Sequence, residues 1–266
     1  VCMILDCSKY VGPCRCGREH TLETKKVVVE YNALDKFDQY MDEVGLSGKR
    51  AVIYDTNTYN LPTLRHVRAD QEIVLNAEGL HSEKGMIEDM MRQLDHPDVI
   101  VAVGSGTIMD FGRYPAYHLG IPFVAVPTLA SSDGFTANIC SIIIDGQKKS
   151  IPMQVAALVV CDLNVVSGAP PWLTVSGISD ILAKYISLAD WKIAHLVSGE
   201  YYCPMVADLA QEALTIMRKA ADDMAAGGKP DFEAMTMAQM ISGLTMQLLN
   251  HSRAASGAEH LMAHLV

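Results

Sequence analysis

The pattern of apolar and polar positions changes once along the chain. Between about residues 26 and 162, short apolar runs alternate with amphipathic segments whose apolar residues recur at helical spacing. This alternation is typical of a parallel sheet whose strands are joined by helices. Beyond residue 169 only helical patterns occur, so we predict a Rossmann-like α/β domain over residues 1–168 and an all-helical domain over residues 169–266. The predicted strands are 27–29, 51–54, 72–75, 99–103, 123–126 and 158–161, and the predicted helices of the second half are 172–197, 203–226, 232–249 and 258–266.

The fourth predicted strand leads into the most informative stretch of the chain. Its five apolar residues, 99–103, suit a strand that is buried on both faces of a sheet. Gly104-Ser105-Gly106 interrupts the run, and a helical pattern follows. When a strand leads through a glycine turn into a helix, the N-terminus of the helix can bind an anion. Glycine in the turn lets a pyrophosphate lie against the backbone. A glycine pair after a strand can also be a simple tight turn, so this stretch alone leaves nucleotide binding open.

Polar residues also follow two other predicted strands. Asp55 ends the second strand, where a carboxylate can accept hydrogen bonds from a ribose or, equally well, cap a helix. Thr128 ends the fifth strand, and Ser131 and Asp133 lie in the polar loop after it. The carboxyl edge of an open α/β sheet is where ligands bind, so we expect this loop to face a ligand.

A hairpin is expected next, with one strand at 139–144 and a turn at Asp145-Gly146. The turn leads into Lys148 and Lys149. Two lysines here could meet a phosphate group, but a solvated turn is the commoner explanation of such a pair, and we favour it.

The predicted helical half contains two sets of chemically active side chains. Asp180 and Lys184 are four residues apart in an otherwise apolar helix, where a carboxylate is costly unless it is paired or bound to a metal. The spacing also permits a simple internal ion pair. His260 and His264 lie one helical turn apart, a spacing that allows both to coordinate one divalent metal, although most such pairs are structural. The last helical pattern has no stop signal, and we expect the natural chain to continue.

The N-terminal segment holds Cys14, Cys16 and His20 in the sequence CRCGREH. Thiolate and imidazole are preferred zinc ligands, so one interpretation is a small zinc knot. The spacing is not that of a standard zinc finger, and only three candidate ligands lie close together. We therefore favour a β-hairpin with incidental thiols. The chain's seven cysteines are an odd and scattered set, which suggests reduced thiols in a reducing compartment.

Composition excludes several classes of partner. A net charge of −10 disfavours nucleic acid, because phosphate contacts need clustered Lys and Arg. No apolar run reaches membrane-spanning length and no signal peptide is evident, so we predict no membrane insertion and a cytoplasmic location.

Four motifs together resemble the glycerol-1-phosphate dehydrogenase family, within the wider group of iron-containing alcohol dehydrogenases, glycerol dehydrogenases and dehydroquinate synthases. They are VAVGSGTIMDFGRY, PTLASSDG, SGISDILAKY and SRAASGAEH. The resemblance runs from the CRCGREH segment to the last residue. It implies a dehydroquinate synthase-like fold, and reversible reduction of dihydroxyacetone phosphate to sn-glycerol 1-phosphate by NADH or NADPH. It also implies a homo-oligomer, a dimer, and a divalent metal that polarises the carbonyl, with zinc the first candidate and nickel or iron as alternatives.

The resemblance also assigns roles to residues. Asp180 and His260 would bind the metal. The second family histidine belongs to a His-Gly-Glu type motif that is not found before Val266. The sequence departs from the family pattern at Ser105, Arg113 and Ala254. The implied catalytic residues are Asp133 and Lys184, the implied substrate ligands are Asp133, Lys149, Lys184, Arg253 and His264, and the implied cofactor ligands are Asp55, Gly104, Ser105, Gly106, Thr107, Asp110, Thr128 and Ser131.

Three alternatives stay open. A glycerol dehydrogenase would share most of these motifs but would bind no phosphate. A cyclisation like that of dehydroquinate synthase is less favoured, because that group usually has Glu where Asp180 stands. A non-catalytic nucleotide-binding relative would keep the fold without the metal.

Overall fold

The computed structural model describes residues 3–4 and 7–263. They form two compact units. The first comprises strand β1 (Met3–Ile4), Glu23–Leu129 and Asn138–Ala169. The second comprises residues 7–22, Ala130–Ala137 and residues 170–263. The sequence predicted a single division after residue 168, with the segments 7–22 and 130–137 in the first domain. In the structure these two segments belong to the second unit.

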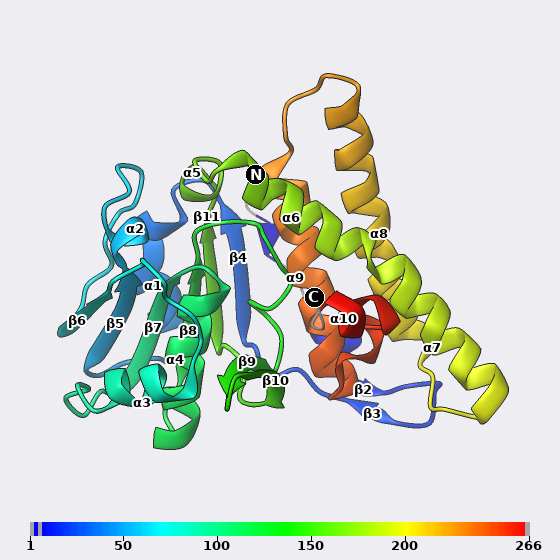
Figure 1. The fold of residues 1–266 in the computed structure, drawn as a ribbon, viewed down its shortest axis with the longest axis horizontal. Coiled ribbons are helices and arrows are strands. Elements are labelled where there is room, and N and C mark those ends of the chain that lie inside the picture. The colour runs from blue at the N-terminus through cyan, green and yellow to red at the C-terminus, as the bar shows by residue number, and fades with distance from the viewer. Residues whose placement is uncertain (1–2, 5–6, 264–266) are drawn as a thin grey trace. The chain divides into compact units, whose positions relative to one another are not determined.

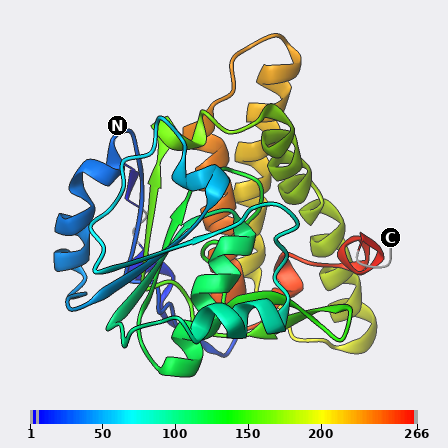
Figure 2. The same ribbon diagram turned by 60° about the vertical axis from the view of Figure 1, so that its left-hand side comes forward.

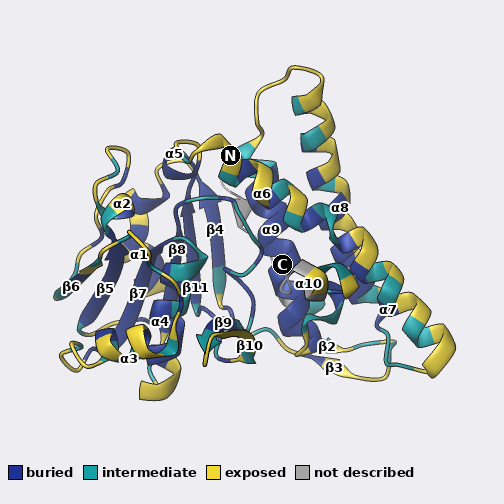
Figure 3. Ribbon diagram, viewed as in Figure 1, coloured by how far each residue is buried: buried dark blue, intermediate teal, exposed yellow. Residues whose placement is uncertain are grey.

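The first unit is built on a seven-stranded sheet in the order β1-β4-β11-β8-β7-β5-β6 (Figure 1). Strand β1 is antiparallel to its neighbour, and the other six strands are parallel. Every residue of β5, β7, β8 and β11 is buried, as continuous apolar runs require of strands covered on both faces (Figure 3). The predicted parallel sheet is confirmed. Its parallel strands are β4 (Lys26–Glu30), β5 (Arg50–Asp55), β6 (Gln71–Leu75), β7 (Val99–Gly104), β8 (Phe123–Pro127) and β11 (Leu158–Asp162).

Helices connect these strands, and one of them packs unusually close to the sheet. A Cβ on Gly112 would lie 2.7 Å from the Cβ of Ala102 and 2.8 Å from the ring of Phe123, so only glycine permits this approach. The predicted hairpin with its turn at Asp145-Gly146 is confirmed. The remaining elements of this unit are η2 (Ala33–Lys36), α1 (Phe37–Glu43), α2 (Thr56–Tyr59), α3 (Lys84–Met91), α4 (Gly106–Leu119), β9 (Ile139–Ile144), β10 (Gln147–Pro152) and α5 (Leu163–Val166).

The second unit is largely helical. Helices α8 and α9 lie side by side along much of their length (Figure 1, Figure 2). Helix α9 is buried from Met235 to Leu249, so it has no exposed face over this stretch and Met can fill the space around it. Among the described residues, no helix combines the length and apolar character needed to cross a bilayer. The elements are η1 (Cys7–Tyr10), β2 (Gly12–Pro13), β3 (Glu19–His20), α6 (Pro171–Leu182), α7 (Lys184–Ser198), α8 (Pro204–Ala225), α9 (Phe232–Leu249), η3 (Ser252–Ala254) and α10 (Ala258–Ala263).

The single helix predicted over 172–197 is wrong in one respect, because the structure has two helices that meet at Ala183. The backbone N–H of Ile186 donates to the carbonyl of Ala183, three residues back, at 2.9 Å. This tighter turn interrupts the α-helical ladder. The apolar pattern continues across the junction, so periodicity could not reveal it.

Candidate functional site

In the first unit, the candidate anion site lies where β7 leads into α4. Strand β7 has β5 on one side and β8 on the other, and β6 lies beyond β5, so the chain order reverses between β5 and β7. In open α/β sheets, ligands bind at the carboxyl ends of strands at such a reversal. The side chain of Ser105 makes no capping hydrogen bond to α4, and Gly106 and Thr107 are partly exposed. The helix N-terminus can therefore receive an anion.

The other predicted cofactor residues of this unit have defined partners. The backbone N–H of Thr128 donates to the carbonyl of Gly104 at 3.2 Å, which fixes the end of β8 beside the turn. Asp55 caps α2, since its carboxylate accepts the backbone N–H of Thr58 at 2.7 Å and the Thr58 hydroxyl at 3.2 Å. This is the capping role that the sequence left open.

Asp110 and Lys149 occupy contrasting environments. The carboxylate of Asp110 accepts the hydroxyl of Ser82 at 2.9 Å and the backbone N–H of Ser141 at 3.2 Å. Burial raises the pKa of Asp110, although the nearby Arg113 acts to lower it. Asp110 thus ties α4 to two neighbouring segments, whereas Lys149 is exposed on β10.

Gly106→Asp tests the anion site separately from the fold. An acid in the first turn of a helix stabilises the helix, but here it would repel a pyrophosphate. We expect the Kd for NADH to rise by about tenfold or more, with no loss of thermal stability, because each 1.4 kcal/mol of lost binding is tenfold. The matched control is Gly85→Asp, in the exposed first turn of α3. Equal Kd values for both variants, measured by fluorescence titration, would contradict the assignment.

The second unit holds a buried charged cluster, which we call the Asp133–Lys184–Asp180 cluster. The ammonium of Lys184 lies 3.0 Å from Oδ1 of Asp180 and 3.1 Å from Oδ2 of Asp133. The backbone N–H of Asp133 donates to the other oxygen of Asp180 at 3.0 Å. The hydroxyl of Ser242 donates to Oδ2 of Asp133 at 2.7 Å. The ion pair that the spacing of Asp180 and Lys184 permits exists, and Asp133 extends it.

Small residues hold the loop that carries Asp133. A Cβ on Gly177 in α6 would lie 2.0 Å from the carbonyl oxygen of Ala130, and a Cβ on Gly243 in α9 would lie 2.3 Å from that of Asp133. Only glycine lets the loop lie this close to both helices. Ser242 was not among the predicted site residues, although the Ser-Gly pair that it forms with Gly243 stands out in an otherwise Met-rich helix.

The cluster has an excess of negative charge. Two carboxylates share the ammonium of Lys184, which is only 1% exposed. The pKa of Asp180 is raised to about 6, first by burial and then by the charge of Asp133. Burial acts to lower the pKa of Lys184, but the two carboxylates outweigh it and raise that pKa. Two carboxylates and one ammonium leave one negative charge, which would attract a divalent metal, and a carboxylate such as that of Asp180 is a ligand type that such metals accept.

The structure does not bring all the predicted metal and substrate residues together. His260 lies on α10, which packs against α7. Among residues 3–4 and 7–263, Asp180 and His260 are not members of any group of three or more metal-ligand side chains. His264 lies outside the described residues.

Arg253 is held by an ion pair. Its Nε donates to a carboxylate oxygen of Glu200 at 2.9 Å, and its Nη2 donates to the carbonyl of Asp190 at 3.3 Å. The residue lines a pocket of about 340 Å³. The other lining residues are Arg18, Trp191, Glu200, Tyr201, Leu249, Asn250 and His251.

Comparison with known families matches residues 28–170, more than half of the chain, to the family described as iron-containing alcohol dehydrogenase. The chain belongs to the iron-containing alcohol dehydrogenase family. The resemblance found in the sequence motifs is therefore confirmed.

Curated relatives extend the similarity over almost the whole chain. A protein of Bacillus licheniformis named glycerol-1-phosphate dehydrogenase (NAD(P)+) is 34% identical over 267 residues, covering 96% of this chain and 67% of the relative. One of the same name from Halalkalibacterium halodurans is 33% identical, covering 98% and 68%. The chain thus spans about two thirds of the length of these relatives.

Solved structures of other dehydrogenases share the fold. Glycerol dehydrogenase from Schizosaccharomyces pombe matches with a TM-score of 0.71 at 20% identity, covering 90% of this chain and 63% of that one. The archaeal Red Sea brine pool alcohol dehydrogenase ADH/D1 matches with a TM-score of 0.74 at 15% identity, covering 95% and 70%. The predicted fold class is confirmed.

Proposed function

We propose that this protein reduces dihydroxyacetone phosphate to sn-glycerol 1-phosphate, reversibly, with NADH or NADPH. The observation that carries the proposal is the 31–34% identity, over most of the chain, to proteins named glycerol-1-phosphate dehydrogenase. The open N-terminus of α4 and the buried charged cluster supply the two kinds of site that this reaction needs.

Residues of the first unit bind the dinucleotide. The turn from Gly104 to Thr107 and the N-terminus of α4 receive the pyrophosphate through backbone N–H groups. Thr128 lies on the nicotinamide side, as the motif PTLASSDG suggests, and the same motif assigns Ser131, a residue of the second unit, to that side. Asp55 accepts a ribose hydroxyl in addition to capping α2, and Asp110 holds the helix in place.

Residues of the second unit bind the metal and the substrate. Asp180 and His260 hold the divalent metal. Zinc, nickel and iron are all candidates, because each accepts carboxylate and imidazole ligands. When bound, the metal supplies a Lewis acid for the carbonyl oxygen. Asp133 orients a substrate hydroxyl, and Lys184 holds both carboxylates in position. Arg253 and, from the first unit, Lys149 are the candidates for the substrate phosphate, and the planar guanidinium favours Arg253.

Arg253→Ala tests the phosphate assignment. We expect the KM for dihydroxyacetone phosphate to rise by about tenfold or more while the KM for NADH changes little, since a lost charge-assisted hydrogen bond costs about 1.5–3 kcal/mol. The control is Glu200→Gln, which weakens the ion pair of Arg253 but keeps the guanidinium. Equal effects of Arg253→Ala on both KM values would contradict the assignment.

The substrate class is tested by comparing phosphorylated and unphosphorylated ketones. We expect NADH oxidation with dihydroxyacetone phosphate to exceed that with dihydroxyacetone by at least tenfold in kcat/KM, and the product to be the sn-1 enantiomer. A preference for dihydroxyacetone or glycerol would indicate a glycerol dehydrogenase. Binding of NADH without turnover of either ketone would indicate a non-catalytic relative.

A further inference from the structure

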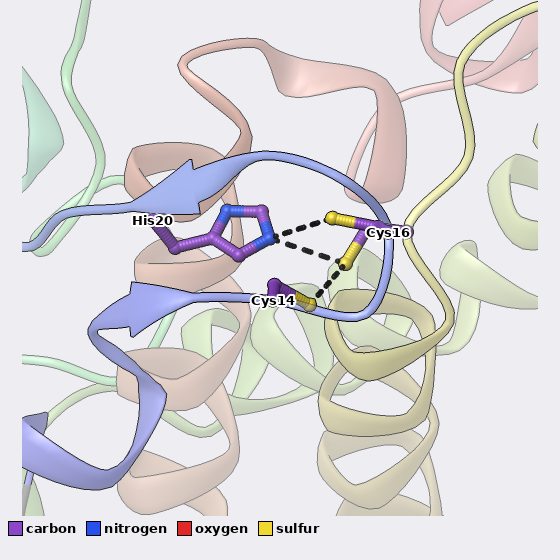
Figure 4. Close-up of side chains that lie close together, drawn as sticks. Cys14, Cys16 and His20 are labelled. Carbon is purple, nitrogen blue, oxygen red and sulfur yellow. Dashed lines mark hydrogen bonds between the residues drawn. The ribbon is translucent and has the colours of Figure 1, made fainter.

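Three thiols and one imidazole gather at one point of the second unit. The hairpin of β2 and β3 carries Cys14, Cys16 and His20, whose side chains point toward one another (Figure 4). Cys203, which directly precedes α8, joins them although it lies 183 residues beyond His20. One potential ligand atom from each of the four residues lies within 4.8 Å of the others. The predicted hairpin is confirmed. The interpretation of its thiols as incidental did not include Cys203, which is the fourth potential ligand.

Three of the separations between these atoms are close to those around a tetrahedral zinc ion. The sulfurs of Cys14 and Cys203 are 3.8 Å apart, and Nε2 of His20 lies 3.4 Å from the sulfur of Cys16 and 3.3 Å from that of Cys203. Typical Zn–S and Zn–N bonds in a tetrahedron place two sulfurs about 3.8 Å apart and sulfur and nitrogen about 3.6 Å apart. The observed spacing needs only small adjustments to enclose an ion.

The hydrogen bonding of His20 prepares it as a ligand. Its Nδ1 lies 2.6 Å from the carbonyl oxygen of Leu248, in the last turn of α9. A carbonyl oxygen only accepts, so Nδ1 carries the proton and Nε2 presents its lone pair to the three sulfurs. A ligand histidine is typically oriented in this way, by a hydrogen bond from its other ring nitrogen.

Two of the sulfurs lie next to groups that can stabilise negative charge, although burial acts against that charge at Cys203 by raising its pKa. Cys203 is the N-cap residue of α8, a helix of 22 residues whose N-terminus carries partial positive charge. The hydroxyl of Tyr201 lies 3.0 Å from the sulfur of Cys16, and the guanidinium of Arg18 lies 3.5 Å from the centre of the Tyr201 ring. Three thiolates and one divalent ion leave a single negative charge, and the guanidinium of Arg18 places a positive charge on the neighbouring Tyr201 ring.

We propose that Cys14, Cys16, His20 and Cys203 form a structural zinc site, which fastens the β2–β3 hairpin to the start of α8. Four protein ligands fill a tetrahedron and leave no position for a substrate, which distinguishes a structural zinc site from a catalytic one. His20 and Cys203 are buried, and Cys14 and Cys16 are only partly exposed. The three thiols release their protons to solvent when zinc binds. This site shares no ligand with the metal proposed at Asp180.

A disulfide between Cys14 and Cys203 is the competing outcome. It would require the two sulfurs to close from 3.8 Å to about 2.05 Å and an oxidant to accept two electrons. It would also leave Cys16 and His20 with no zinc ion to bind.

Metal analysis of variants tests the proposal. We expect the wild type to retain one zinc per chain that Cys203→Ser loses and that Asp180→Ala keeps. The matched control is Cys161→Ala, which removes a buried thiol of β11 outside the cluster and should keep this zinc. After exchange with Co2+, thiolate-to-cobalt charge-transfer absorption should appear in the wild type and in Asp180→Ala and be absent from Cys203→Ser.

A measurement on the wild type keeps the test decisive if Cys203→Ser does not fold. X-ray absorption at the zinc edge should show sulfur ligands at about 2.3 Å, which the carboxylate and imidazole of the proposed Asp180 site cannot supply. The proposal is overturned if wild-type protein contains no sulfur-ligated zinc, or if peptide mass analysis finds Cys14 and Cys203 joined as a disulfide.

Discussion

Asp180→Ala is expected to lower kcat for reduction of dihydroxyacetone phosphate by about a thousandfold or more, because it removes a proposed metal ligand and with it the stabilisation of the developing alkoxide. The change also takes from Lys184 one of its two carboxylate partners and from the Asp133 N–H its acceptor. Steady-state kinetics and metal content, measured on the same samples, should both fall.

Two variants isolate the role of the Asp180 charge. Asp180→Asn keeps an oxygen for the Asp133 N–H and removes only the anionic ligand, so it should be nearly as inactive as Asp180→Ala. Asp222→Ala removes an exposed carboxylate paired with Arg218 on α8 and should leave kcat unchanged. Wild-type kcat and metal content in Asp180→Ala would exclude Asp180 as a ligand.

Lys184→Met is expected to lower the free energy of unfolding by about 3–5 kcal/mol, the cost of leaving buried charges without their partner. The methionine preserves most of the side-chain volume, so the loss reports the charge. Urea unfolding in the presence of EDTA measures it without compensation by a metal.

The controls for Lys184→Met vary the number of unpaired charges. Adding Asp133→Asn removes one of the two carboxylates and should restore part of the lost stability. Lys219→Met breaks an exposed pair with Asp223 and should not change stability measurably. If Lys184→Met unfolds at the same urea concentration as the wild type, the Asp133–Lys184–Asp180 cluster does not stabilise the fold.

Much of the fold could be predicted from the sequence because its signals are local. Strands buried on both faces have continuous apolar sequences, so β5, β7 and β8 are recognisable without knowledge of the strands that pair with them. Helix α9 begins and ends at the predicted residues, since Asp231 caps its start and Asn250 adopts the left-handed conformation at its end. The break at Ala183 escaped prediction because it changes one hydrogen bond and leaves the apolar pattern intact.

The candidate sites depend on contacts that sequence patterns do not encode. The spacing of Asp180 and Lys184 allowed for their ion pair, but Asp133 joins them from a loop 47 residues before Asp180. Cys203 stands alone in the sequence, and only the fold places it beside the hairpin cysteines. In both cases the additional residue comes from a segment that is distant in the sequence and close in the fold. The local pattern of apolar and polar residues does not identify such a residue.

The proposed reaction needs a divalent metal and a reduced nicotinamide cofactor to act together on dihydroxyacetone phosphate. The most direct measurement is NADH oxidation with this ketone, on protein expressed from the complete gene, before EDTA treatment, after it, and after a divalent metal is restored. We expect turnover that EDTA abolishes and that zinc, nickel or iron restores. Undiminished turnover in the metal-free protein, or none in folded, metal-replete protein, would contradict it.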